Sequence, residues 1–113
     1  MRLSADDINR IISALAPFTL PGPCSVYLFG SRVDDGKHGG DIDLLLVAET
    51  QDQAFQLRRQ KLDISVSMTK HLGDRRVDLT IANSDDLKTD PFLAAIWPTA
   101  VMLHRWEPRS EPQ

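Results

Sequence analysis

A short apolar run at residues 42–47 constrains the fold of this chain more than any other stretch. Two glycines precede it and polar residues follow it, which is the pattern of a buried β-strand. Because alternate side chains of a strand share a face, Asp41 and Asp43 are expected on one side and Ile42 on the other. The sequence therefore predicts a strand that begins with two carboxylates.

A third acid is predicted on another strand. Residues 76–82 alternate between polar and apolar side chains, so Asp78 shares a face with other polar residues. If this strand pairs beside residues 42–47, the backbones lie about 4.8 Å apart and Asp78 reaches the same site. The alternative is a surface residue on an edge strand. Converging carboxylates favour Mg²⁺, or Mn²⁺, because these ions prefer oxygen ligands and offset the repulsion between the acids.

A glycine-containing loop precedes the acidic strand. Residues 24–29 predict a strand that runs into Gly30 and Ser31. Glycine lets the backbone approach a ligand closely, and the N–H groups that follow can donate to phosphate oxygens. Arg32 could also contact phosphate, although a solvated loop residue is the simpler interpretation. The candidate nucleotide-binding residues are therefore Gly30, Ser31 and Arg32.

Helices are predicted around these strands. Apolar residues in 8–15 fall at helical spacing after a candidate cap at Ser4, and Pro17 with the later prolines at 21 and 23 is expected to end this helix. Residues 51–72 predict one long helix, because neighbouring parallel strands need a crossover, although alternation at 64–68 would also suit a strand. Its apolar stripe is Leu57, Ile64, Met68 and Leu72, with Phe55, Leu62 and Val66 beside it, and its expected C-cap is Gly73.

The end of the chain predicts short elements. One helix is expected after Asn83 and another from Asp90 to Trp97, followed by a strand over 100–104 and a disordered tail over 107–113. The prediction is a single domain over 1–106. Its fold class is α/β (α+β), a small mixed sheet of about four strands flanked by helices.

The spacing of these motifs resembles the minimal nucleotidyltransferases of the polymerase-β-like superfamily. The shared pattern is Gly30-Ser31, then Asp41-Ile42-Asp43 before an apolar run, then Asp78 on a later strand, and the resemblance covers nearly the whole chain. One departure is Gly40, at a position that is often serine in that family. The resemblance implies the nucleotidyltransferase fold, similar to the palm of polymerase β.

The resemblance also implies a chemistry. Asp41 and Asp43 would bind two Mg²⁺ ions, Asp78 would bind the catalytic ion and help to activate the attacking hydroxyl, and Gly30 with Ser31 would hold the triphosphate. The expected activity transfers a nucleoside monophosphate, such as AMP from ATP, to a hydroxyl group.

The acceptor is expected on a partner or a second copy, because the chain is short. In the family resembled, the partner is commonly a helical HEPN-domain protein, frequently a toxin RNase to which its antitoxin attaches AMP. Two alternatives remain: a binding module that neutralises its partner by contact, and a small-molecule nucleotidyltransferase, which the length of the chain disfavours.

Composition and charge reduce the number of protein classes to which this chain could belong. A net charge of -3 argues against generic nucleic-acid binding. The single cysteine, Cys24, is expected in the core and permits no internal disulfide. The apolar runs are far shorter than the roughly 20 residues of a membrane span, and no leader pattern precedes Ser4, so a cytoplasmic protein is expected.

Isolated histidines and aromatic residues carry less information. His71 and His104 have no partner at the spacing of a zinc site. Phe92, Trp97 and Trp106 could stack on a base or contact a partner, with packing of the C-terminal helix slightly favoured.

Overall fold

The structure of the chain is a computed structural model that describes residues 3–19, 23–29, 42–73 and 75–107. The expected tail therefore lies, from residue 108 on, outside the described residues. Within the described ranges, no helix combines the length and the apolar character needed to cross a bilayer. The elements are α1 (Ala5–Thr19), β1 (Cys24–Phe29), β2 (Ile42–Ala48), α2 (Gln51–Arg59), α3 (Lys61–Leu72), β3 (Val77–Asn83), α4 (Asp86–Thr89), α5 (Pro91–Ile96), the 3-10 helix η2 (Trp97–Thr99) and β4 (Val101–Trp106).

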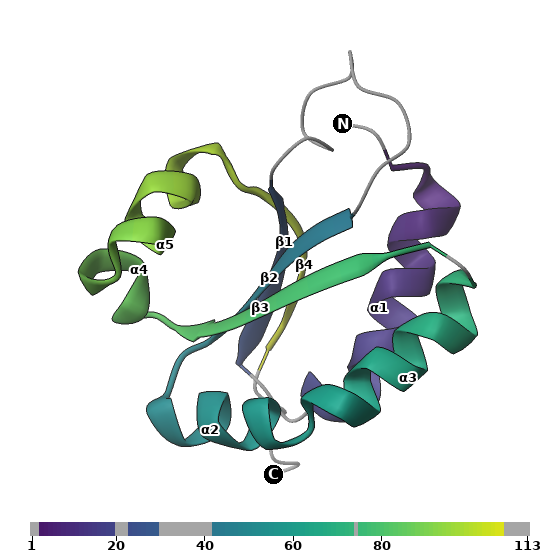
Figure 1. The fold of residues 1–113 in the computed structure, drawn as a ribbon, viewed down its shortest axis with the longest axis horizontal. Coiled ribbons are helices and arrows are strands. Elements are labelled where there is room, and N and C mark those ends of the chain that lie inside the picture. Colours follow the sequence, from purple (N-terminus) through teal and green to yellow (C-terminus); the bar gives the residue numbers. More distant parts are fainter. Residues whose placement is uncertain (1–2, 20–22, 30–41, 74, 108–113) are drawn as a thin grey trace, which may run out of the picture.

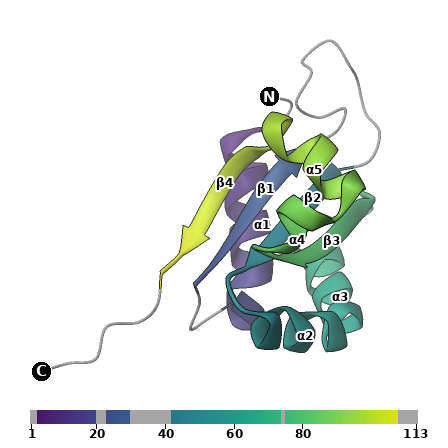
Figure 2. The same cartoon turned by 90° about the vertical axis from the view of Figure 1, so that its left-hand side faces the viewer.

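The strands form one mixed sheet in the order β3-β2-β1-β4. β1 is antiparallel to both of its neighbours, and β2 is parallel to β3. Figures 1 and 2 show α1 and α3 on one face of the sheet and α4 and α5 on the opposite face. The predicted α/β fold with a four-stranded mixed sheet is thus confirmed.

Strand β2 is buried on both of its faces, as the sequence predicts. Ile42, Leu44 and Leu46 point into a larger core, whereas Leu45 and Val47 point into a smaller one. The larger core lies against α1, α2 and α3, and its members include Ile11, Leu15, Val26, Leu28, Leu57, Ile64 and Met68. The smaller core lies against α4 and α5, and includes Phe29, Ala82 and Leu93. The division of these side chains between the two cores follows from the two-residue period of a strand.

The prediction of one helix over 51–72 is wrong, because the helix breaks at Gln60. The first half, α2, packs against β2 and β3, whereas α3 packs against α1, where the Ser67 hydroxyl donates to the Ala14 carbonyl at 2.9 Å. Two different packing surfaces require two helix directions. The predicted C-cap of α3 is confirmed, and Gly73 adopts a φ of 70°, which side chains with a Cβ rarely adopt.

The second part of the predicted helical stripe lies outside the core. Phe55, Leu62 and Val66 are 54%, 77% and 48% exposed. The other stripe, which begins at Leu57, is buried as expected. The helices α2 and α3 therefore bury one face each and present these three apolar side chains to solvent.

Pro17 does not end the first helix, which continues to Thr19. A proline in a helix removes the N–H that would bond the carbonyl four residues earlier, here that of Ser13. Both Pro17 and Ser13 are exposed, so water can solvate that carbonyl. The predicted start is confirmed, because the Ser4 hydroxyl accepts from the Asp7 N–H at 3.1 Å.

The predicted helix that begins near Asp90 and the predicted final strand are both present, but their first and last residues differ from the prediction. The Asp90 carboxylate caps α5 by accepting from the backbone N–H groups of Phe92 and Leu93 at 2.9 and 3.3 Å. The final strand extends to Trp106, two residues beyond the prediction, because its pairing with β1 continues to Cys24.

An ion pair joins α1 to the connection between α3 and β3. The Arg75 guanidinium lies 2.7 Å from the Asp7 carboxylate, and this hydrogen bond and charge lower the pKa of Asp7 below its ordinary 3.8. The variant Asp7→Asn should therefore lose about 0.5–1 kcal/mol of unfolding free energy at neutral pH. Because the folded-state pKa is depressed, this contribution is present above 3.8 and disappears as the pH falls through the lowered value.

Thermal unfolding at neutral and at progressively lower pH measures this difference. Asp6→Asn, which changes an exposed carboxylate in the same helical turn, is the matched control and should resemble the wild type throughout. A stability difference between Asp7→Asn and wild type that stays constant into strong acid would contradict the assignment.

Candidate metal and nucleotide site

Asp43 and Asp78 lie side by side near the beginning of two neighbouring strands. They are direct register partners in the parallel pair of β2 and β3. The Ile42 N–H donates to the Arg76 carbonyl at 2.9 Å immediately before them, which extends the pairing to this end of the sheet. Strand backbones are spaced at about 4.8 Å, and register partners share a face, so the two carboxylates enter one small volume. The pairing of the two strands, which is the condition for a shared site, is thus met.

The two aspartates differ in exposure. Asp43 is half-buried on the central strand β2, whereas Asp78 is exposed on β3, which is an edge strand of the sheet. Both side chains face the side of the sheet that α4 and α5 partly cover. A ligand held by the pair would thus contact one half-buried and one exposed carboxylate.

The end of β1 lies on the other side of Asp43. Phe29, the last residue of β1, is its register partner in the antiparallel pair of β1 and β2. The remaining predicted site residues follow Phe29 or precede Ile42 in the sequence and lie outside the described residues; they are Gly30, Ser31, Arg32 and Asp41. The structure therefore brings together two of the three predicted acids, and the roles of all these residues stay predictions.

The donor chemistry of the pair fits a hard divalent cation. Carboxylate oxygens are the ligands that Mg²⁺ and Mn²⁺ prefer, and a cation would offset the repulsion between two adjacent negative charges. No cluster of three or more possible ligands forms within the described ranges. The predicted third acid, Asp41, falls outside them. Asp43 and Asp78 thus fit part of a Mg²⁺ site.

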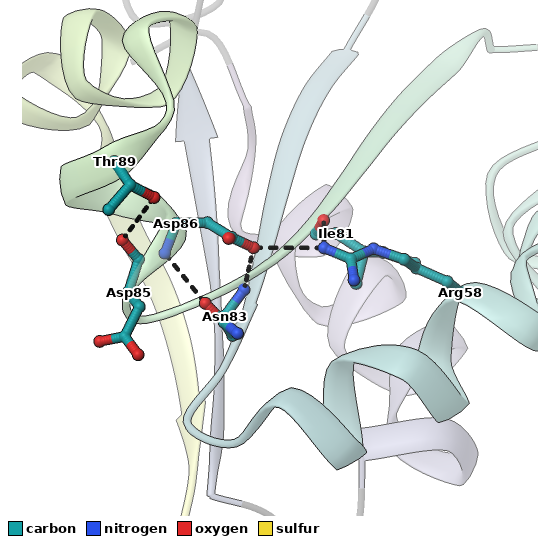
Figure 3. Close-up of polar contacts among 6 residues, drawn as sticks. All are labelled: Arg58, Ile81, Asn83, Asp85, Asp86 and Thr89. Carbon is teal, nitrogen blue, oxygen red and sulfur yellow. Dashed lines mark hydrogen bonds and ion pairs between the residues drawn. The ribbon is translucent and has the colours of Figure 1, made fainter.

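A polar network sets where α4 lies over this face (Figure 3). The Asp86 N–H donates to the Asn83 side-chain oxygen at 2.9 Å, and the Asn83 N–H donates to the Asp86 carboxylate at 3.0 Å. Arg58 donates to the same carboxylate at 3.2 Å and to the Ile81 carbonyl at 3.1 Å. These bonds join α2, the end of β3 and the start of α4, and so position the helices that follow.

Removal of the hydrogen bond from the Asp86 N–H to the Asn83 side chain is expected to destabilise the fold. In Asn83→Ala the first N–H of α4 loses its partner at a position that is only partly exposed, so the unfolding free energy should fall by about 1–2 kcal/mol. The neighbouring exposed Ser84 gives a control, since Ser84→Ala should change it by less than about 0.5 kcal/mol. Urea unfolding of both variants measures the difference, and equal midpoints would show that this hydrogen bond contributes nothing to stability.

The structure separates the three aromatic residues whose roles the sequence left open. Trp106 is buried in the larger core, and Trp97 packs edge-on against Tyr27 with ring centroids 4.6 Å apart. Both tryptophans therefore pack against other side chains, although Trp106 does so from strand β4 and not from the C-terminal helix. Phe92 differs from them because it is 56% exposed. Only placement in three dimensions separates it, since burial depends on contacts between residues far apart in the sequence.

Other reactive side chains take no part in the site. Cys24 is buried in the larger core, and burial raises the pKa of its thiol to about 12, so the thiol is neutral at physiological pH. His71 Nδ1 lies 2.9 Å from the Ser67 carbonyl on the same helix. His104 packs edge-on against Trp106. The expectation that Cys24 is a core residue is confirmed.

A cavity of about 160 Å³ lies on the opposite face of the sheet from the two aspartates. It opens between α3 and β3 and is lined by Ile64, Met68, Arg75 and Val77, among others. Neither Asp43 nor Asp78 lines it. The cavity is therefore separate from the candidate metal site.

Comparison of the chain with protein-family models and with curated proteins found no match. The function is therefore inferred from the residues of the site and from the motif resemblance described above.

Proposed function

We propose that this chain is a Mg²⁺-dependent nucleotidyltransferase that moves a nucleoside monophosphate from a nucleoside triphosphate to a hydroxyl group. One observation carries the proposal: Asp43 and Asp78 are register partners on neighbouring parallel strands, with their side chains on one face. Asp41 lies two residues before Asp43 in the sequence, which would add a third carboxylate. Three converging carboxylates are what a two-metal transfer site requires.

The proposed reaction is an in-line displacement at phosphorus. The acceptor oxygen forms a bond to the α-phosphorus while the bond from this phosphorus to the β-bridging oxygen breaks, and pyrophosphate leaves. Asp78 accepts the hydroxyl proton and passes it to water, a role suited to the more exposed acid of the pair. When bound, Mg²⁺ or Mn²⁺ would neutralise charge on the triphosphate and on the leaving group.

The residues that hold the nucleotide are proposed from the motif. Asp41, Asp43 and Asp78 would hold the metal ions, and Gly30, Ser31 and Arg32 would hold the triphosphate. Backbone N–H groups beside a glycine can donate to phosphate oxygens at close range. ATP is the proposed donor, on the strength of the resemblance.

The acceptor is proposed to be a partner protein. The described helices all pack around one sheet, and none of them forms a separate acceptor-binding unit within the described ranges. A helical HEPN-type toxin RNase is the partner that the motif resemblance favours. The chain would then be the antitoxin, acting in the cytoplasm by attachment of AMP, and a second copy of this chain is the other protein acceptor to test.

Mass spectrometry tests this proposal directly. The purified chain is incubated with ATP, Mg²⁺ and the helical protein encoded beside it, in parallel with the double variant Asp43→Asn/Asp78→Asn. We expect the neighbouring protein to gain the mass of one or more AMP units in the incubation with the wild-type chain and not in the incubation with the double variant. Asp63→Asn, an exposed carboxylate on α3, is the matched control and should retain the transfer.

The same experiment distinguishes the competing class of function. If a stable complex forms and no mass is added to either protein, the chain acts by contact, as a binding module. Addition of AMP to this chain itself would identify a second copy as the acceptor. Addition that persists in the double variant would overturn the assignment of the two aspartates.

A further inference from the structure

Two aromatic side chains of this protein are more than half exposed. Phe55 is 54% exposed and Phe92 is 56% exposed, whereas the other aromatic residues are buried or half-buried. Phe55 lies on α2, which packs on the larger core, away from the face that carries the two aspartates. Phe92 lies on α5, which covers that face.

The Phe29 side chain links Phe92 to the carboxylate pair. Its ring meets that of Phe29 at a centroid distance of 6.4 Å, and Phe29 is the register partner of Asp43. Register partners in antiparallel strands have Cα atoms about 5 Å apart, so Phe92 lies on the order of 10 Å from the Asp43 backbone. In Figure 2, α5 lies in front of the end of the sheet where β1 finishes and β2 begins.

One face of the Phe92 ring is uncovered, and the backbone that carries the ring is held in place. The two rings meet at 78°, edge to face, so Phe29 covers at most one face of the Phe92 ring. The Asp90 carboxylate accepts from the Phe92 N–H at 2.9 Å, which holds the backbone at this position. The side chain is therefore a pre-positioned aromatic surface beside the candidate metal site.

We propose that Phe92 holds the nucleobase of the nucleoside triphosphate by stacking, an inference that rests on the function proposed above. The α-phosphate must lie at the carboxylate pair, and the ribose separates it from the base. The distance from Asp43 to the base thus includes the carboxylate–metal–phosphate contact and the sugar, which together are comparable with the separation of Phe92 from Asp43. Stacking accepts any base because every base has a π-face, so Phe92 contributes affinity more than choice of base.

Calorimetric titration of the full chain with Mg²⁺ and two probes tests the proposal. The first probe is α,β-methylene-ATP, which carries a base and resists transfer, and the second is inorganic tripolyphosphate, which has no base. In Phe92→Ala, the dissociation constant of the first should rise about 5- to 150-fold, as stacking energies imply. That of tripolyphosphate should change less than about twofold, because its metal contacts remain.

Two further variants complete the design. Phe92→Tyr keeps the ring and should bind α,β-methylene-ATP as the wild type does. Phe55→Ala removes an equally exposed phenylalanine from the other face and should also bind normally. Circular dichroism melting of each variant establishes that it is folded before titration.

The possible outcomes distinguish the stacking role of Phe92 from the proposed nucleotidyltransferase function. If the wild type binds both probes and Phe92→Ala binds them equally well, Phe92 is not the base platform and the proposed function stands. An equal loss of both probes in Phe92→Ala would also overturn the stacking role, since it would indicate a disturbed metal site. If the wild type binds neither probe, the nucleotidyltransferase proposal itself is overturned.

Discussion

Replacement of Asp43 by asparagine is expected to lower the rate of nucleotidyl transfer by about 10²- to 10³-fold or more. Asparagine keeps the shape of the side chain but removes the charge that would hold Mg²⁺ beside the triphosphate. The two remaining acids, Asp41 and Asp78, are not expected to compensate, because the proposed two-metal site uses three converging carboxylates. Pyrophosphate release in the presence of ATP, Mg²⁺ and the acceptor protein measures the effect.

Stability measurements distinguish the loss of a site from the loss of the fold. Asp43 is half-buried and faces away from the larger core, and asparagine has nearly the same shape as aspartate, so the substitution leaves no cavity. We expect Asp43→Asn to stay folded, with a melting transition close to that of the wild type. Mg²⁺ with α,β-methylene-ATP should raise the melting temperature of the wild type and not that of the variant, since only ligands that bind the folded state stabilise it.

Asp63→Asn is the control for both measurements, because Asp63 is an exposed acid on α3, on the other side of the sheet. It should match the wild type in rate and in its response to the ligand. Normal transfer by Asp43→Asn would refute the proposed function. A large fall in its melting temperature would instead show that Asp43 serves the fold.

The largest effect on stability is expected from Leu44→Ala. Leu44 lies on the central strand β2 and is fully buried in the larger core, on the face opposite Asp43. Truncation removes buried apolar surface and leaves a cavity, at a cost of about 3–5 kcal/mol. Since domains of this size have unfolding free energies of about 5–15 kcal/mol, the variant should be close to unfolding at physiological temperature.

Urea unfolding measures this difference, with Leu62→Ala as the control. Leu62 is the same residue type but is 77% exposed on α3, so its truncation should change the unfolding free energy by less than about 0.5 kcal/mol. Similar costs for the two substitutions would contradict the assignment of Leu44 to the core. The contrast depends only on burial, because the chemical change is identical.

Strand positions could be predicted from the sequence because their pattern is local. The two-residue period of a strand placed Asp43 and Leu44 on opposite faces of the sheet. Alternation in β3 likewise placed Asp78 and Leu79 on opposite faces, as the structure confirms. The apolar run between glycines and polar residues likewise located β2. None of these inferences requires knowledge of which elements are neighbours.

Helix limits depended on packing that no local pattern contains. The stripe that begins at Leu57 resumes at Ile64 in helical phase, with polar residues at the intervening positions of the stripe, so its period alone does not locate a break. The helix breaks at Gln60 because α2 and α3 pack on different surfaces. Pro17 is a strong local signal to end a helix, but at an exposed position water can solvate the carbonyl that it leaves unpaired.

The sequence by itself determined the strands, the faces on which their side chains lie and the acidic residues that could share a site, because backbone geometry fixes these over two or three residues. Only the tertiary structure decided that β2 and β3 are parallel neighbours with Asp43 beside Asp78. It also decided that Trp97 and Trp106 pack against other side chains while Phe92 stays exposed beside the site. Strand pairing and burial depend on contacts between residues far apart in the chain, and the free energy of those contacts exists only once the chain is folded.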